Sequence, residues 1–231
     1  MAEIRDDALL LRRVPFSDTS LICHFLSKEH GRITLMARGA RRPKSSFRAS
    51  LEPLYALQIS WKPGRTGMGT LVDVQRGRCL LEPSLSLHGL ELLAITSRLF
   101  QEGDPHGFDE TGQALALLAE RGEQQGLCAA VWYLLDVAGW LGNLSHCWHC
   151  DADAQQMMYW RQAQLLCESC GDNGRNGSKG MRVSAGLRKS IEAVLAGGNV
   201  RLHAADAACW RDMIRQALQE HGIKATDSFK V

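Results

Sequence analysis

Two pairs of cysteines constrain this chain more than any other feature of its sequence. Two residues lie within each pair, Cys147/Cys150 and Cys167/Cys170, and sixteen residues separate the pairs. This spacing is typical of a zinc site, because Zn2+ takes four thiolates in a tetrahedron at about 2.3 Å and a Cys-x-x-Cys turn directs two sulfurs at one centre. We therefore expect these four cysteines to hold one structural zinc ion, in a motif at 145–172. Two disulfides, a redox-active pair, or a chance spacing are the alternatives.

The spacer between the pairs has the length of one β-hairpin, which would bring the second pair back to the first. We expect its short strands at 157–160 and 164–166, with the turn at 161–163, and interpret the whole as a zinc ribbon. Trp148 and Trp160 are expected to pack over the small core of this ribbon, because aromatic side chains bury a large apolar area; stacking on nucleic-acid bases is the alternative.

Length and composition indicate a soluble globular protein. The chain has 231 residues, of which 45% are hydrophobic and 23% charged, enough for one large domain or two ordinary ones. Its N-terminus has no secretory signal, and its longest apolar run, at 127–135, is far shorter than the roughly eighteen residues that span a bilayer. We expect a cytoplasmic protein in which the other four cysteines are small core residues: Cys23, Cys79, Cys128 and Cys209.

The net charge of +2 conceals an uneven distribution. Residues 1–80 contain 14 Lys and Arg against 7 Asp and Glu, whereas residues 81–231 contain 13 against 18. We therefore expect two domains, 1–80 and 81–231, with different partners. A basic domain in a nearly neutral protein indicates binding to nucleic acid or another polyanion.

The first 80 residues have the pattern of a small all-β domain. Five runs rich in strand-forming residues are bounded by Gly, Pro and polar turns, at 8–14, 20–27, 32–38, 54–61 and 70–75. Five short strands fit a closed barrel of the OB-fold type, whose usual ligands are oligonucleotides and oligosaccharides. The glycine-rich segment 64–69 lacks the Lys and Ser/Thr of a phosphate loop, so we interpret it as a hairpin connection.

A cationic loop, residues 38–48, is expected between the third and fourth strands. Gly39 and Pro43 exclude a regular helix or a central strand there. The loop carries five cations: Arg38, Arg41, Arg42, Lys44 and Arg48. We interpret them as DNA-binding residues, because clustered cations bind phosphates in a salt-dependent way that is largely blind to sequence; a merely solvated surface is the alternative. The next candidates on this domain are Arg13 and Arg32, with Arg12, Arg76 and Arg78.

Past Pro83 the hydrophobic period becomes that of helices. Ser84 is expected to cap the first helix, Ser184 a later one, and Gly222 to end the last. The predicted helices lie at 84–101, 109–122, 124–141, from 184 onward and at 203–221. The sequence therefore predicts an α+β protein, with an N-terminal OB-fold barrel followed by an α-helical domain that carries an inserted four-cysteine zinc ribbon.

The sequence contains no strong catalytic motif, and we expect no enzymatic activity. Neither Gly-x-Ser-x-Gly nor His-Glu-x-x-His occurs. Acidic residues at 104–110 and 151–153 could bind a divalent metal, although loops and helix caps commonly collect Asp. His146 and His149 flank the cysteines and could replace one of them, but four thiolates suffice.

With these residues assembled, the chain resembles the RecO family of bacterial recombination mediators over nearly its whole length. In the helical part the resemblance rests on Glu91-Leu92, the paired cysteines, and 222–224 with Ser228. In the barrel it rests on four segments: DTSLI at 18–22, EHGR at 29–32, RGARR at 38–42 and LEP at 51–53. The zinc cysteines are not universal in that family, which is consistent with a structural metal.

The resemblance implies a protein that binds single- and double-stranded DNA, anneals complementary strands, and acts with RecR to replace single-stranded DNA-binding protein by the recombinase RecA. It also implies a docking groove on the helical domain for the acidic C-terminal tail of single-stranded DNA-binding protein. Four cations there are candidates to receive the carboxylates of that tail: Arg188, Lys189, Arg211 and Arg215. An RNA-binding accessory factor and a zinc-ribbon enzyme that processes nucleic acid are the alternatives.

Overall fold

The computed structural model describes residues 2–64, 67–172, 180–224 and 229. Its chain divides into two compact units, 1–123 and 124–231. The barrel itself ends at Cys79, close to the boundary expected at residue 80, but the next two helices belong to the same compact unit as the barrel. Among the described residues, no helix is both long and apolar enough to cross a membrane.

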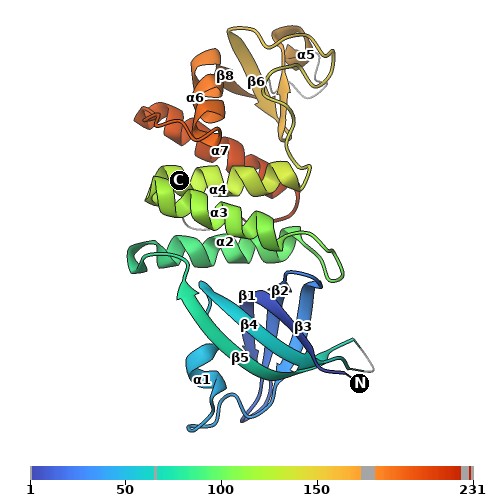
Figure 1. The fold of residues 1–231 in the computed structure, drawn as a ribbon. Coiled ribbons are helices and arrows are strands. Elements are labelled where there is room, and N and C mark those ends of the chain that lie inside the picture. The colour runs from blue at the N-terminus through green and yellow to red at the C-terminus, as the bar shows by residue number, and fades with distance from the viewer. Residues whose placement is uncertain (1, 65–66, 173–179, 225–228, 230–231) are drawn as a thin grey trace. The chain divides into compact units, whose positions relative to one another are not determined.

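Five strands close into a barrel in the first unit (Figure 1). β1 pairs with both β2 and β4 in antiparallel fashion, and β3 pairs with β5 in parallel, so that the order around the barrel is β1-β2-β3-β5-β4. This arrangement confirms the predicted α+β class and the OB-type barrel. The strands are β1 (Ile4–Pro15), β2 (Leu21–Ser27), β3 (Gly31–Ala37), β4 (Tyr55–Lys62) and β5 (Gly69–Cys79).

The barrel core follows from the alternation of side chains along each strand. Every strand contributes a large apolar residue that is at most 3% exposed: Leu10, Phe25, Leu35, Ile59 and Leu71. Full burial of such a side chain stabilises the folded state by about 1.5–3 kcal/mol. The other face of β1 is apolar and buried at Leu9 and Leu11, whereas the cations of this strand, Arg5, Arg12 and Arg13, lie at exposed positions.

The helices of the first unit differ in detail from those predicted. A single turn, α1 (Phe47–Ser50), closes the cationic loop, and Pro83–Leu85 form a short 3-10 helix before α2 (Ser86–Leu99). Ser84 therefore lies inside the 3-10 turn and makes no capping hydrogen bond. The unit ends with α3 (Phe108–Arg121), which Gly107 precedes; the Gly107 amide donates to Glu110 at 2.8 Å.

The start of β3 is fixed against the end of α2 and the loop that follows it. Arg32 donates from Nη1 to the Ser97 carbonyl at 2.7 Å. Gly31 has a φ of +61°, and a Cβ at this position would lie 1.7 Å from the carbonyl oxygen of Asp104. Glycine is therefore required here twice, by its left-handed backbone and by the close approach of the loop.

The second unit combines helices with a small sheet. Its sheet has the order β7-β6-β8, so a third strand, β8, joins the predicted hairpin. Little in the sequence indicates β8, because it is four residues long and follows a glycine-rich stretch. Ser184 ends this strand and caps α6, accepting from the Leu187 amide at 3.1 Å, as predicted. The elements are α4 (Glu123–Val137), β6 (Met157–Arg161), β7 (Gln164–Leu166), α5 (Glu168–Asp172), β8 (Met181–Ser184), α6 (Ala185–Leu195) and α7 (Ala204–Glu220).

Three tryptophans join the sheet to the helices of the second unit. Trp132 of α4 lies between Trp160 of β6 and Trp210 of α7, with ring centroids 5.6 and 6.2 Å apart respectively. All three side chains are at most 3% exposed. The ribbon is thus anchored through Trp160 to a core that it shares with the helices.

The charge of each compact unit differs from that of the domains expected from the sequence. Residues 81–123, which lie in the barrel's unit, contain 2 Lys and Arg against 8 Asp and Glu, whereas residues 124–231 contain 11 against 10. The negative balance of the second half therefore comes from α2, α3 and their loops. The expected helical domain, 81–231, carries a net negative charge, but the observed C-terminal unit, 124–231, is close to neutral.

We expect Gly31→Ala to lower the free energy of unfolding by about 2–4 kcal/mol, because the new methyl group overlaps a backbone carbonyl and the left-handed conformation disfavours a Cβ. Gly103→Ala is the matched control: Gly103 also has a positive φ, of +84°, but has no heavy atom within 4 Å of the added Cβ. It should lose only about 1 kcal/mol. Urea denaturation followed by circular dichroism measures both; equal losses would show that the Asp104 contact is unimportant.

Candidate metal centre and nucleic-acid interface

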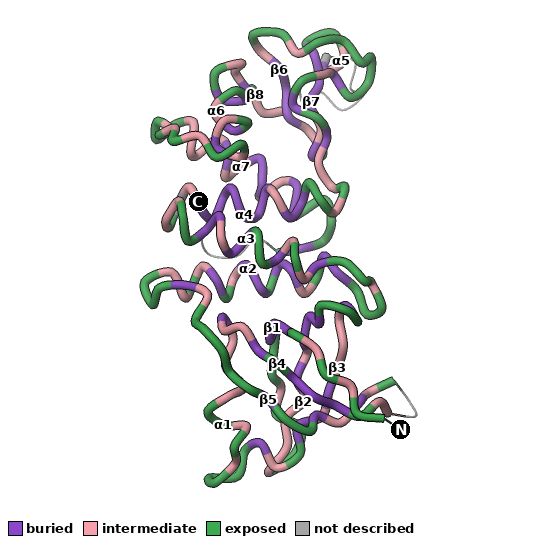
Figure 2. The backbone as a smooth tube through the Cα atoms, in the orientation of Figure 1, coloured by how far each residue is buried: buried purple, intermediate pink, exposed green. Residues whose placement is uncertain are grey.

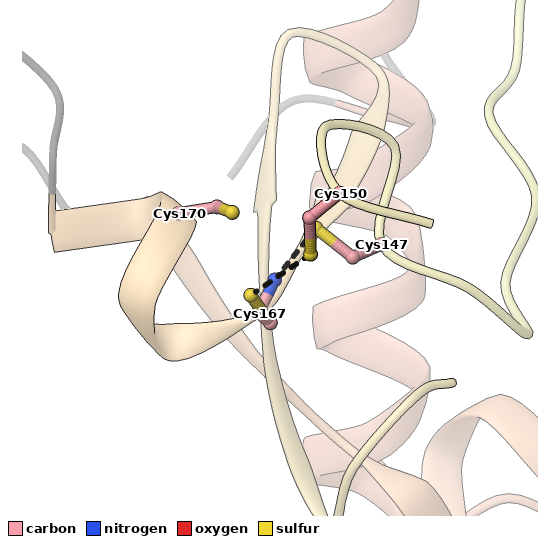
Figure 3. Close-up of side chains that lie close together, drawn as sticks. All are labelled: Cys147, Cys150, Cys167 and Cys170. Carbon is pink, nitrogen blue, oxygen red and sulfur yellow. Dashed lines mark hydrogen bonds between the residues drawn. The ribbon is translucent and has the colours of Figure 1, made fainter. Parts of the chain in front are cut away.

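Four cysteine sulfurs converge on one point of the second unit (Figure 3). Cys147 and Cys150 lie on the turn before the hairpin, Cys167 directly follows β7, and Cys170 lies on α5. All four Sγ atoms lie within 4.8 Å of one another, and those of Cys150 and Cys167 are 3.7 Å apart. Sulfurs bound tetrahedrally at about 2.3 Å from a zinc ion are about 3.8 Å apart. The four donors therefore fit Zn2+, and all are free thiols rather than disulfides.

Backbone amides around Cys147 favour its thiolate form. Burial opposes ionisation of Cys147, but hydrogen bonds from the amides of Cys167, Cys150 and His149 lower its pKa to about 6. The Cys167 amide nitrogen lies 3.3 Å from Cys147 Sγ. Contact with Cys167 raises the pKa of Cys170 to about 12, because each further negative sulfur is disfavoured by its neighbours. A divalent cation bound by the four would offset that repulsion and favour deprotonation.

The hairpin between the pairs holds them in register. Its turn is formed by Gln162 and Ala163, whose φ angles of 52° and 57° are both left-handed, as a two-residue hairpin connection requires. The Trp148 amide donates to the Leu165 carbonyl at 2.8 Å, which fastens the first pair to β7. The predicted hairpin is thereby confirmed.

The two ribbon tryptophans have different environments. Trp160 is fully buried and packs against Trp132 of α4, whereas Trp148 is 61% exposed, so the prediction that Trp148 packs over the ribbon core is wrong. Trp148 lies between Cys147 and Cys150, whose sulfurs face the metal centre. A residue between two such ligands is directed outward, and the spacing alone could have indicated this.

The four cysteines outside the quartet differ in burial. Cys23 and Cys128 are buried core residues, as expected, and burial raises the pKa of each thiol to about 12. Cys209 is half-buried, and Cys79 is exposed. The expectation of a core position is therefore wrong for Cys79, which lies at the last residue of β5, where the strand leaves the barrel.

The acidic clusters make local contacts instead of a second metal centre. In the part of the chain that the structure describes, the cysteine quartet is the one group of three or more His, Cys, Asp or Glu close enough to hold a metal ion. Asp104 accepts from the His106 amide at 2.9 Å, and Asp153 pairs with His146 at 3.2 Å. These residues stabilise turns and loops.

The cationic loop leaves the barrel at the end of β3 and is docked on the turn between β1 and β2. The Arg41 amide donates to the Thr19 carbonyl at 2.9 Å, and its guanidinium donates to the Ser17 carbonyl at 2.6 Å. All five cations of the loop are exposed, consistent with the exposed stretch before α1 in Figure 2. Among the described residues, four of them make no side-chain hydrogen bond or ion pair: Arg38, Arg42, Lys44 and Arg48.

The other two predicted DNA-binding arginines are engaged within the protein. Arg13 donates to the Leu51 carbonyl at 2.7 Å and pairs with Glu52 at 3.1 Å. Arg32 is half-buried and bonded to carbonyls at the end of α2, so the structure gives it a positioning role within the fold. That Arg32 binds DNA stays a prediction, although its guanidinium is already bonded to the carbonyls of Ser97 and Phe100.

The four cations predicted to receive a partner's tail do not form one exposed set. Arg188 is 5% exposed and donates to the Gln155 carbonyl at 2.5 Å; burial lowers its pKa. Arg215 pairs with Asp212 at 2.9 Å. Arg188 is therefore corrected to an internal residue that joins α6 to the ribbon. Lys189 is exposed and Arg211 is half-exposed, so these two keep accessible charge.

Together, the closed five-stranded barrel and the helical unit with its four-cysteine centre define a two-part OB-fold protein. Family comparison refines that class. The model described as "Recombination protein O N terminal" matches residues 1–76, and that described as "Recombination protein O C terminal" matches residues 83–226. The chain belongs to the RecO family.

Among its relatives are proteins named "DNA repair protein RecO" from three bacteria. The protein from Laribacter hongkongensis is 35% identical over 116 residues, which cover 48% of each chain. That from Salinibacter ruber is 38% identical over 109 residues, 44% of this chain and 41% of the relative. That from Coxiella burnetii is 39% identical over 103 residues, 44% of each chain. The chain spans about half the length of the curated relatives it matches.

We expect Cys147→Ser to abolish zinc binding and to unfold the ribbon, because a serine hydroxyl is a poor zinc ligand and structural zinc binding is coupled to folding. Metal analysis of protein purified without chelator should give one zinc per wild-type chain and none for the variant. Cys79→Ser is the control, since Cys79 lies outside the quartet and its sulfur donates to the backbone carbonyls of Leu54 and Leu81. A wild-type protein without zinc, or an equal loss in the control, would contradict the assignment.

Proposed function

We propose that this chain is a DNA-binding protein of recombination and repair that acts in the cytoplasm and has no catalytic activity of its own. The observation that supports it is the cationic loop, in which four exposed cations lack a partner among the described residues. Cations that are not neutralised within the fold attract a polyanion. Membership of the RecO family favours DNA as that polyanion.

The more specific proposal is a mediator that binds single and double strands, anneals complementary strands, and acts with RecR to replace single-stranded DNA-binding protein by RecA. Phosphate contacts support it because they are independent of sequence, as annealing of any two complementary strands requires. Annealing without Mg2+ or ATP would favour this function. Mg2+-dependent cleavage would favour an enzyme, and a preference for structured RNA would favour an RNA-binding factor.

Zinc has a structural part in this proposal. Cys147, Cys150, Cys167 and Cys170 would fill the coordination shell of the ion and leave no open position for water or substrate. The metal would then hold the hairpin and α5 together. Its contribution is to the stability of the ribbon, whose Trp160 packs in the core of the second unit.

We expect the triple variant Arg38→Ala, Arg42→Ala, Lys44→Ala to bind every DNA sequence more weakly and to show a flatter dependence of log K on log[salt]. The slope should fall by roughly 0.7 for each phosphate of a single strand that is no longer neutralised, or about 2 in total. Fluorescence anisotropy of labelled oligonucleotides at several salt concentrations measures it. Arg41 is left unchanged because it docks the loop.

The control for this experiment removes the same charge elsewhere on the barrel, through Arg5→Ala, Lys28→Ala and Lys62→Ala, all at exposed positions. Both triple variants should stay folded, since exposed substitutions usually change stability by less than about 0.5 kcal/mol. If the loop variant kept the wild-type slope, or if the control flattened it equally, the loop would not be the DNA-binding surface.

A partner site on the C-terminal unit is the second part of the proposal. We place the acidic tail of single-stranded DNA-binding protein against Lys189 of α6 and Arg211 of α7, because these cations keep accessible charge. Charge-assisted hydrogen bonds to carboxylates are the strong kind, so two cations contribute usefully to binding a short acidic peptide.

We expect Lys189→Ala with Arg211→Ala to weaken binding of a synthetic tail peptide about tenfold, since this corresponds to about 1.4 kcal/mol of binding free energy. Calorimetric titration of the full chain measures the affinity. Lys28→Ala with Lys62→Ala, on the barrel, should leave peptide affinity unchanged. An effect of equal size from the barrel variant would show that only net charge matters and would refute the site.

A further inference from the structure

A large aromatic side chain, Phe16, stands exposed at the turn between β1 and β2. Its exposed fraction is 56%, although the residues around it in the turn, Ser17 to Ser20, are all polar. Phenylalanine in a polar turn contributes little to the core at such exposure. At this exposure the phenyl ring is accessible to a ligand.

The turn that carries Phe16 is held by hydrogen bonds. The Phe16 amide donates to the Ser20 carbonyl at 3.1 Å, and the Ser20 amide donates to Ser17 Oγ at 3.2 Å. Pro15 precedes it and fixes its own φ near −65°. The phenyl ring is thus presented from an ordered backbone, which reduces the entropic cost when a ligand binds to it.

Strand register places Phe16 next to the cationic loop. Pro15 pairs with Leu21, and Leu21 pairs with Ala37, so β1 and β3 end at the same level of the barrel. Phe16 follows the first of these ends and Arg38 follows the second. Arg41 then bonds to carbonyls of the turn, at Ser17 and Thr19. An aromatic face and several cations therefore share one end of the barrel.

We propose that Phe16 is a stacking platform for an unpaired base of single-stranded DNA whose phosphates are bound by the cationic loop. An aromatic ring beside a positively charged groove is the usual arrangement for sequence-independent binding of single strands. Asp18 is the one carboxylate in the turn, against the five cations of the loop, so the local balance still favours a polyanion. Bases in a duplex are stacked on one another, and the ring discriminates in favour of single strands.

This inference rests on the proposed DNA-binding function. It predicts that removing the Phe16 ring affects DNA binding differently from removing the cations of the loop. Phe16→Ala should weaken binding to a single-stranded oligonucleotide about tenfold, since stacking on an aromatic side chain contributes about 1–3 kcal/mol per base. Affinity for duplex DNA and the salt slope for the single strand should not change, because every cation is retained.

Two further substitutions separate stacking from apolar contact. Phe16→Leu keeps an apolar side chain without an aromatic face and should bind single strands as weakly as Phe16→Ala. Phe16→Trp should restore wild-type affinity. An oligonucleotide of abasic sugars supplies the phosphates without bases, and its affinity should be the same for the wild type and Phe16→Ala. Circular dichroism and the thermal midpoint check that each variant is folded.

The outcomes distinguish failure of the inference from failure of the proposed function. If the wild type binds single strands with a steep salt slope and Phe16→Ala binds equally well, the platform is refuted and the DNA-binding function stands. If Phe16→Ala weakens duplex and abasic strands as much as ordinary single strands, Phe16 supports the turn and does not stack on bases. If the wild type binds no DNA, the proposed function and the inference fail together.

Discussion

The double pairing of β1 determines the rest of the first unit. β1 hydrogen-bonds to β2 on one side and to β4 on the other. The sheet therefore closes on itself, and neither β1 nor β4 is left as an unpaired edge strand. Closure encloses the apolar faces of all five strands and leaves function to the connections between them. It also brings the turn after β1 and the loop after β3 to one end of the barrel, where Phe16 and the cationic loop lie.

Charge and backbone structure act together at that end. Like charges close together repel, so the cationic loop would not hold one conformation through its own side chains. The loop is instead tied by Arg41 to carbonyls of the neighbouring turn, which uses one cation as an anchor and leaves the others exposed. Arg13 and Arg32, by contrast, are engaged within the fold: Arg13 pairs with Glu52, and Arg32 donates to the Ser97 carbonyl. The sequence alone does not distinguish these two arginines from those of the loop.

In the second unit, the four cysteines stabilise the ribbon, as strand closure stabilises the barrel of the first unit. Five- and three-residue strands are too short for independent stability, and the hairpin gains it from two sources. Its four cysteines bring their sulfurs within 4.8 Å of one another at one end, and Trp160 packs against Trp132 in the helical core. The exposed indole of Trp148 follows from the same geometry, because the sulfurs of Cys147 and Cys150 converge on those of the second pair and the residue between them is directed outward.

Local periodicity, turn residues and cysteine spacing were enough to predict the five barrel strands, most of the helices, the four-cysteine centre and the position of the cationic loop. They could not predict where the compact units divide, the addition of β8, the burial of Arg188, the bonding of Arg32 within the fold, or the placement of Phe16 beside the cations. Those features depend on contacts between segments that are distant in the chain. A residue's type fixes its charge and size, but its exposure is set by the neighbours that the fold brings to it.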